Sequence, residues 1–412
     1  MRIVRGFARV LCLASAVALC LPIAAQRPGS RWWLDRMLIG IYGPLPANHT
    51  NFIAARESGF KIIIHGSADC LPIAQEDRLL AIVKDPRFSA TDGKVLNDPE
   101  QRKKLDALMN RLGHSAAFYG YYLAENARAS DFPALGKTVA YLRKKDPDHF
   151  SFISLLPISA SPTEWGAATY EEYLDRFVKT VDPDFLCFHF VPFVREGDAA
   201  LYLKNLAIVR RKAVESKMPF AVIVRVGAAG ARKWPVAPKQ LRWLAGTALA
   251  YGARGVTFEP YWGTPATGGI LVNGERTELH EVAGELNTAM ISMTGNMVWA
   301  SSQGAYHVGP AFPEGERLPP DCVVQDVSGG SFIVGIFQGE KGRRLVLVCN
   351  ADWERSTLAQ VKLREPVGQV MEMKLDKALW RGLQVIRRPG GPQVAVVPLT
   401  FKPGELRLLD LR

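Results

Sequence analysis

Residues 118–125 read FYGYYLAE, a short run of aromatic and aliphatic side chains that ends on a carboxylate, Glu125. A run of this texture is typical of a strand that is buried on both faces, as strands of parallel sheets are. Seven further runs of the same kind lie between residues 37 and 263, and stretches with helical periodicity separate them. The seven runs are MLIGIYG (37–43), FKIIIHG (60–66), LLAIVKD (79–85), FSFISLLP (150–157), FLCFHFVPF (185–193), FAVIVRVG (220–227) and GVTFEPYWG (255–263).

The segments between these runs carry helix signals. Asp98 followed by Pro99 suits an N-cap and a first helical position. Thr169 precedes Glu172 by three residues, which is the spacing of a capping box. The segment 72–78 is weaker, and we expect it to hold barely two helical turns.

Eight strands that alternate with helices predict a (β/α)8 barrel, which we place at residues 26–299. A doubly wound open sheet is the alternative. That fold would be supported by a glycine-rich nucleotide fingerprint after the first strand. The sequence there is GIYGPLPANHT, with prolines instead, so the barrel is favoured.

The texture changes from about residue 300. Residues 300–321 are rich in glycine and proline and indicate a linker. Residues 322–412 contain short alternating runs separated by turn residues such as GEKG, so an antiparallel β-sandwich is expected.

The first 25 residues have the three-part form of a secretory signal peptide. Arg2, Arg5 and Arg9 give a positive start, an apolar stretch spans 10–23, and Ala25 offers a small residue for cleavage. No other segment has about 18 unbroken apolar residues, so no stable membrane span is expected. We therefore expect an exported protein, periplasmic or extracellular.

Cysteine usage is compatible with export. Cys20 in the leader would allow a lipid-anchored start, but Leu19 is a poor small residue before it. Cys322 and Cys349 lie in one small domain and would be free to pair in an oxidising compartment, although sequence cannot establish the pairing. No cysteine or histidine spacing suggests zinc. We expect neither a metal nor a cofactor.

The formal net charge is +11. A basic exported protein favours acidic partners such as uronate or sulfated glycans or a membrane surface, and the plainer alternative is a solvated basic surface. No block of lysine and arginine interleaved with aromatics points to nucleic acid. The sequence does not indicate the oligomeric state.

Barrel enzymes carry their catalytic groups at the carboxyl ends of the strands, because the loops there form one open mouth. The fifth strand offers little that is ionisable at this end. The candidate site residues at the other strand ends are Tyr42, Asp85, Arg87, Glu125, Asn126, His189, Arg225, Glu259, Tyr261 and Trp262.

Two carboxylates beside aromatic side chains are what glycoside cleavage requires. On period-2 alternation Glu125 shares a face with Tyr121 and Leu123, which we expect to line the barrel interior. The alternative is a helix-capping glutamate or one paired with a surface arginine such as Arg128.

Glu259 is the expected second carboxylate, on a face shared with Thr257 and Tyr261. The alternative for Glu259 is a buried ion pair with Arg225, and both can hold because an arginine neighbour keeps a carboxylate ionised. Trp33, Trp165, Trp234 and Trp262 are candidates for stacking on sugar rings, or for packing.

Asp85 is the alternative second carboxylate, although Asp-Pro is also an ordinary turn start. Arg87 and Asn126 are candidate substrate ligands. His189 would bind a hydroxyl or move a proton, or be a hydrogen-bonded core histidine. Arg225 would bind an anionic substrate group or balance Glu259.

Three stretches resemble exported bacterial barrel proteins that are glycoside hydrolase-like, near family 42 β-galactosidases in the clan of retaining barrel glycosidases. The C-terminal stretch from 332 is similar to the β-sandwich of those proteins. The three stretches are FYGYYLAENARASDFPALGKTVAYLRKKDPDH (118–149), YEEYLDRFVKTVDPDFLCFHFVPF (170–193) and LRWLAGTALAYGARGVTFEPYWG (241–263).

The resemblance implies that Glu125 is the acid/base residue, which follows strand four in that clan. The chain also departs from the clan's pattern. Ala124 and Asn126 flank Glu125 where a polar residue and proline are common, and His189 opens a run that differs from the clan's Asp-His-Tyr. Strand seven ends in Arg225 where the clan has its nucleophilic glutamate. Either Glu259 has taken that role, or the barrel does not hydrolyse.

Three functions follow. The first is an exported glycosidase that acts on a poly- or oligosaccharide, an acidic one among the candidates, with Glu125 as general acid/base and Glu259 or Asp85 as its partner. The second is a non-catalytic glycan-binding or scaffold protein on a degenerate barrel. The third is a phosphate-handling barrel, because VGAAGARKW (226–234) is glycine-rich and basic.

Overall fold

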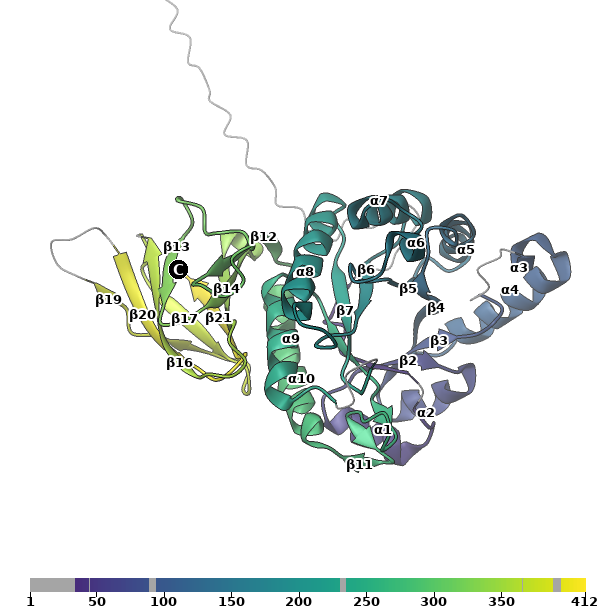
Figure 1. Ribbon diagram of the computed structural model, residues 1–412. Helices are drawn as coiled ribbons and strands as arrows, with labels where there is room; N and C mark the ends of the chain where they lie inside the picture. Colours follow the sequence, from purple (N-terminus) through teal and green to yellow (C-terminus); the bar gives the residue numbers. More distant parts are fainter. Residues whose placement is uncertain (1–33, 44, 89–93, 230–234, 365, 388–393) are drawn as a thin grey trace, which may run out of the picture.

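The computed structural model describes residues 34–43, 45–88, 94–229, 235–364, 366–387 and 394–412. Eight parallel strands close into a barrel, in which each strand pairs with the next and β8 pairs with β1 (Figure 1). All eight predicted strands are present, and the expected (β/α)8 barrel is confirmed. The strands are β1 Gly40–Tyr42, β2 Ile62–Gly66, β3 Leu80–Lys84, β4 Phe118–Ala127, β5 Phe150–Leu155, β6 Leu186–Phe190, β7 Phe220–Arg225 and β8 Val256–Glu259.

Helices connect and surround these strands, and their ends follow the predicted signals. The Asp98 side chain accepts hydrogen bonds from the backbone N–H groups of Glu100 and Gln101, and Thr169 accepts one from Glu172. The helix after the second strand has only six residues, as its weak signal indicated. The helices are α1 His49–Glu57, α2 Leu71–Glu76, α3 Lys94–Asn97, α4 Pro99–Gly113, α5 Phe132–Lys145, α6 Pro162–Trp165, α7 Tyr170–Val181, α8 Asp198–Glu215, α9 Pro238–Ala250 and α10 Glu278–Met297, with a 3-10 turn η1 Ala68–Cys70.

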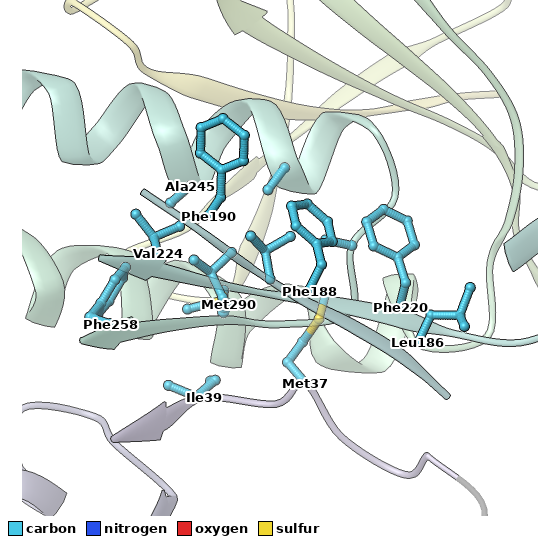
Figure 2. Close-up of a cluster of buried hydrophobic side chains, with 14 of the residues drawn as sticks. Met37, Ile39, Leu186, Phe188, Phe190, Phe220, Val224, Ala245, Phe258 and Met290 are labelled. Atoms are coloured by element: carbon cyan, nitrogen blue, oxygen red, sulfur yellow. The ribbon is translucent and has the colours of Figure 1, made fainter. Parts of the chain in front are cut away.

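Alternate residues of the strands supply two apolar layers. One layer fills the barrel interior and includes Ile64, Ile82 and Phe152. The other lies between the strands and the surrounding helices. Figure 2 shows part of this outer layer, in which apolar side chains of β6, β7 and β8 meet Ala245 of α9 and Met290 of α10. The inner layer leads directly to the mouth of the barrel.

Two antiparallel sheets follow the barrel, and a second apolar core lies between them. The expected β-sandwich-like region is confirmed. The six-stranded sheet has the order β12 Ser301–Val308, β14 Phe332–Gln338, β15 Arg344–Asn350, β21 Leu406–Leu411, β17 Val370–Lys374, β18 Leu379–Gly382, and the four-stranded sheet has the order β13 Val324–Ser328, β16 Thr357–Arg364, β20 Val394–Phe401, β19 Ile386–Arg387.

Part of the stretch that we predicted to be a linker is a strand. Ser301–Val308 form β12, which pairs with β14 along its length. The glycine and proline residues that suggested a linker lie mostly after this strand, between residues 309 and 320. Composition averaged over the whole stretch therefore concealed the alternating residues at its start.

Three other expectations concern the whole chain. The four cysteines among the described residues, Cys70, Cys187, Cys322 and Cys349, are free thiols, so Cys322 and Cys349 do not pair. The predicted signal peptide lies outside the described residues. Within the part of the chain that the structure describes, no helix is long and apolar enough to cross a membrane.

Helix α9 joins the two regions, because it packs on the barrel and also contacts β14, β15 and β21 of the six-stranded sheet. Its residues from Trp243 to Ala250 are all buried. A side chain at Gly246 would meet Cys349 Sγ and the Gly404 carbonyl oxygen at 2.9 Å, and one at Gly404 would meet the Trp243 backbone nitrogen at 2.6 Å. Glycine at both positions therefore permits this close packing.

Two small features complete the fold, one after the barrel strands and one in the six-stranded sheet. Residues after β8 form a three-stranded sheet that precedes α10. The turn η2 connects β14 and β15. These elements are β9 Trp262–Gly263, β10 Leu271–Val272, β11 Glu275–Arg276 and η2 Glu340–Gly342.

Candidate active site

The carboxyl ends of the barrel strands carry a ring of polar side chains. Ile82 and Phe152 belong to the inner apolar layer, so Lys84 and Ser154, two residues further along each strand, share that inward face. The same alternation applies to His189 after Cys187 and to Arg225 after Ile223. His65 directly follows the inward-facing Ile64 and departs from this alternation, at a register shift of β2 and with a φ of +78°. The residues that the ring brings together at the mouth are Tyr42 (β1), His65 (β2), Lys84 (β3), Tyr122 (β4), Ser154 (β5), His189 (β6), Arg225 (β7) and Glu259 (β8).

Glu259 is the best-held carboxylate of this ring. Arg225, its register partner on β7, places Nη1 at 3.0 Å from Oε1 and 3.1 Å from Oε2. His189 places Nε2 at 3.2 Å from Oε2, in the geometry of an ion pair and not of an aligned hydrogen bond. The Glu259 side chain keeps 16% of its surface exposed. The ion pair that we considered for Glu259 therefore exists, and the carboxylate still reaches solvent.

The environment of Glu259 favours its ionised form. Burial by itself raises the pKa of a carboxyl group, but the close contact with His189 and the charge of Arg225 outweigh it, so the pKa of Glu259 is lowered. Glu259 is therefore an anion at neutral pH. Its charge is available to any group that binds above it.

Three rings form an aromatic cluster beside Glu259. The hydroxyl oxygens of Tyr42 and Tyr122 lie 2.6 Å apart and are buried. The His65 ring lies 4.6 Å from that of Tyr42 and 4.1 Å from that of Tyr122, centroid to centroid. Burial, and then the charge of Lys84, lower the pKa of His65 to about 3, although Glu259 opposes them. His65 is therefore neutral, and its buried Nε2 has no hydrogen-bond partner among the described residues.

Glu125 lies near enough to this cluster to affect its tyrosines, but our reason for placing it there was wrong. Tyr121 and Leu123 belong to the outer layer, and the Tyr121 hydroxyl donates to Asp146 at 2.6 Å. The pairing of β4 with β5 shifts register after Tyr122 and again after Ala124. These bulges break the period-2 alternation on which the prediction depended.

The bulged end of β4 leaves Glu125 exposed and close to the two tyrosines. Burial raises the pKa of Tyr42 and of Tyr122, and the charge of Glu125 raises both further. Among the described residues Glu125 has no hydrogen bond or ion pair, so the pairing with Arg128 that we considered is not formed. The charge of Glu125 affects the pKa of Tyr42 and of Tyr122. The charge of Glu259 affects the pKa of His65, so the two carboxylates border the same aromatic cluster.

Asp85 and Arg87 are placed near the mouth but are tied to each other. Arg87 donates from Nε to Oδ1 at 2.7 Å and from Nη2 to Oδ2 at 2.6 Å, and its backbone N–H also donates to Oδ1. The hydrogen bonds from Arg87 lower the pKa of Asp85 despite its partial burial. This local pair fits the turn that we considered as the alternative for Asp85.

Asn126 continues the irregular end of β4. Its φ is +50°, a left-handed conformation, and its backbone N–H donates to Ser154 Oγ at 3.1 Å. Its Oδ1 is buried without a hydrogen-bond partner among the described residues. Asn126 thus connects the ends of β4 and β5.

Tyr261 is not in the site, contrary to our expectation. It is fully buried in the outer layer, where its ring meets Phe60 at 5.1 Å. Strand β8 ends at Glu259, so alternation cannot be extended past Pro260 to Tyr261. Trp262 is half-buried in β9 against the outer layer, and Trp165 is also packed there. Trp33 and Trp234, two further stacking candidates, lie outside the described residues.

Lys84, Tyr122, Ser154 and His65 are members of the ring that were not among our predicted site residues. The signal for Lys84 was available, because it follows Ile82 by two residues at the end of a strand. Ser154 was overlooked because it is not ionisable. Among the described residues, no group of three His, Cys, Asp or Glu side chains has the arrangement of a metal site.

Comparisons with known proteins support the fold. No protein-family model matches the chain, and no curated protein sequence does. The structure is similar to a catalytic mutant of a GH42 β-galactosidase from G. stearothermophilus, with a TM-score of 0.60 at 8% identity over 91% of this chain and 98% of that chain. It is similarly close to the β-galactosidase from Bacillus circulans sp. alkalophilus, with a TM-score of 0.59 at 9% identity over 91% of this chain and 99% of that one.

A third similarity is to the β-galactosidase of the psychrophilic Marinomonas ef1, with a TM-score of 0.48 at 10% identity over 62% of this chain. The chain spans 60% of that protein's length. The similarities with TM-scores of 0.60 and 0.59 show that the chain has the fold of those two β-galactosidases, a (β/α)8 barrel followed by C-terminal sheets, as the resemblance in its sequence implied. At these identities the similarity concerns the fold alone.

Proposed function

We propose that this protein is an exported glycoside hydrolase that acts on a poly- or oligosaccharide with Glu125 as general acid/base and Glu259 as the ionised carboxylate. The observation that carries the proposal is that both carboxylates border one aromatic cluster at the barrel mouth. Glycoside cleavage needs two carboxyl groups of this kind on either side of the scissile bond.

Glu259 suits the role of the anionic partner. The oxocarbenium-like transition state develops positive charge at the anomeric carbon, and a carboxylate that stays ionised stabilises it or attacks it. His189 and Arg225 hold Glu259 in that state and orient it from β6 and β7. Its exposed edge is the part that a sugar would meet.

Glu125 suits the role of the residue that exchanges protons. It is exposed and has no ion-pair partner among the described residues. A sugar bound at this mouth would cover the exposed Glu125 and exclude water from it. That desolvation favours the protonated acid, which is the form that donates to the leaving oxygen.

A second function, glycan binding without cleavage, is favoured by one observation. Arg225 stands at the end of β7 and contacts both oxygens of Glu259, which competes with any attack of that carboxylate on a sugar. In this case the same mouth would hold an oligosaccharide and release it unchanged.

The test compares kcat on a panel of aryl glycosides and oligosaccharides for the full chain and for three variants. Glu125→Gln should lower kcat by about 10²–10⁴-fold, the usual contribution of a positioned general acid/base. Glu259→Gln should lower it by at least about a hundredfold, because preorganised charge at the reacting centre is lost. Glu57→Gln, an exposed glutamate at the end of α1, should leave it unchanged.

A Glu125→Gln protein as active as the unmodified chain would overturn the proposed mechanism. Calorimetric binding of an oligosaccharide with no product over days would instead select the glycan-binding function. Export is tested separately, by mass spectrometry of the mature N-terminus, which should begin at Gln26 after cleavage at Ala25.

A further inference from the structure

We propose that the saccharide bound at this mouth is anionic, with its carboxylate or sulfate group held by Lys84. The proposal rests on the proposed function for the location of the site, and it adds the chemical class of the substrate. It concerns Lys84, a member of the ring to which the proposed mechanism gives no role.

The first step is the position of Lys84. It is the last residue of β3, and it shares the inward face of Ile82, a fully buried residue of the inner layer. The side chain is therefore directed along the barrel axis toward the mouth. Its ammonium group lies 5.3 Å from the centre of the Tyr122 ring. This cation–π contact orients the lysine over the same ring that Glu125 influences.

The second step is the balance of charge in the mouth. The charge of Arg225 is met by Glu259, and that of Arg87 is met by Asp85. Lys84 has no ion-pair partner among the described residues. Among the described residues of the ring, Lys84 is therefore the cation that no ion pair neutralises. An anionic group on the substrate would neutralise it.

The third step is the place of Lys84 relative to the reacting groups. The charge of Lys84 lowers the pKa of His65, and the charge of Glu259 raises it. The ammonium therefore lies beside the cluster that both carboxylates border. A negative group on the sugar at the cleavage point, or on its direct neighbour, would come within reach of the lysine. The overall charge of +11 would also attract such a substrate from solution.

The experiment measures binding by calorimetry on the Glu125→Gln protein, so that turnover does not consume the probe. Three tetrasaccharides of equal length are compared: one of galacturonic acid, one of sulfated galactose and one of unmodified galactose. We expect at least one anionic probe to bind about tenfold or more tightly than the neutral one, the size of a charge-assisted hydrogen bond. Which of the two does so identifies carboxylate or sulfate.

Three further variants in the same background locate the preference. Lys84→Met should remove it, and Lys84→Arg should keep most of it. Lys137→Met, which removes an exposed lysine of α5 without an ion pair among the described residues, should leave it intact. Raising the salt concentration from 0.05 to about 0.5 M should weaken the preference, because added ions screen exposed charges.

Equal or tighter binding of the neutral tetrasaccharide would overturn the inference, as would a preference that survives in Lys84→Met. Absence of binding for all three probes would overturn it together with the assignment of the mouth as a sugar site. Tight anion-selective binding in a chain that releases no product would refute hydrolysis and leave the inference supported. The failure of one proposal is thus distinguishable from the failure of the other.

Discussion

Two buried carboxylates, one in each part of the molecule, show how similar electrostatics serve different ends. Glu372 on β17 has no exposed surface, and it accepts hydrogen bonds from Arg407 and Arg381, both at 2.8 Å, with Lys374 at 3.2 Å. Glu259 at the barrel mouth has Arg225 and His189 as neighbours and keeps 16% of its side chain exposed.

Burial raises the pKa of both groups, and in both the neighbouring cations reverse the effect, so both pKa values are lowered. The difference lies in what remains open. Cations from β17, β18 and β21 surround Glu372 and bind those strands together. The cations of Glu259 come from two adjacent strands and leave the solvent side free. A lowered pKa therefore does not by itself identify a catalytic carboxylate. The carboxylate must also have a side that solvent, and so a substrate, can reach.

The largest expected effect is on stability, at Glu372, which its cations enclose. Glu372→Gln should lower the free energy of unfolding by about 3–5 kcal/mol, because three cations lose the buried charge that they neutralise. Urea unfolding at pH 7 measures this. At a temperature where the variant is folded, kcat/KM should equal that of the unmodified chain. A loss of activity in the folded variant would contradict the purely structural role of Glu372.

Acid should remove the same contribution. The pKa of Glu372 is lowered in the folded chain, so its stabilising contribution is present above the ordinary carboxyl pKa of about 4.3. It is lost as the pH falls through the lower folded-state value. The difference in unfolding free energy between the unmodified chain and Glu372→Gln should therefore be constant from pH 8 to 5 and should shrink below pH 4. A difference that grows on acidification would refute this sign.

The next largest effect concerns Glu259, the carboxylate that still reaches solvent. Arg225→Gln removes a positive neighbour of Glu259, so the pKa of Glu259 should rise. If catalysis needs the ionised form, the acidic limb of the kcat/KM profile should shift to higher pH by the same amount. Profiles from pH 3 to 8 measure the shift. An unmoved limb would mean that Glu259 does not control activity.

The smallest effect concerns the hydroxyl pair between the two carboxylates. Tyr42→Phe removes the 2.6 Å contact with Tyr122 and should cost about 1 kcal/mol of stability. It should also raise KM, because it alters the wall of the mouth. Tyr121→Phe is the matched change on the outer side of the same barrel, where the hydroxyl donates to Asp146. That variant should lose similar stability with unchanged KM, and a change in its KM would weaken the distinction between the two sides.

The strands and most helix ends could be predicted because local residues determine them. FYGYYLAE reads as a strand without any partner, and Asp98 caps a helix through atoms within three residues of it. The pair of Arg225 and Glu259 was also foreseeable, since both end adjacent strands of a closed barrel.

The faces of residues near strand ends could not be predicted in the same way. Alternation put Tyr121 and Leu123 on the same face as Glu125, which is wrong because two register shifts in β4, set by its pairing with β5, separate them. It also failed for Tyr261, which lies beyond the end of β8. A bulge is decided by the neighbouring strand and not by the sequence of the strand that contains it. Mouth residues such as Ser154 were missed because an uncharged side chain gives no signal before its neighbours are known.

The position of helix α9 has a practical consequence for anyone who wishes to study the barrel alone. Residues that elsewhere in a barrel's outer ring would face water are here covered by β14, β15 and β21, as Gly246 and Gly404 show. A chain truncated near residue 300 would expose this apolar surface of α9 to solvent and would be prone to precipitate. Attempts to produce a minimal catalytic fragment should therefore retain the C-terminal sheets, or else redesign α9 with polar residues.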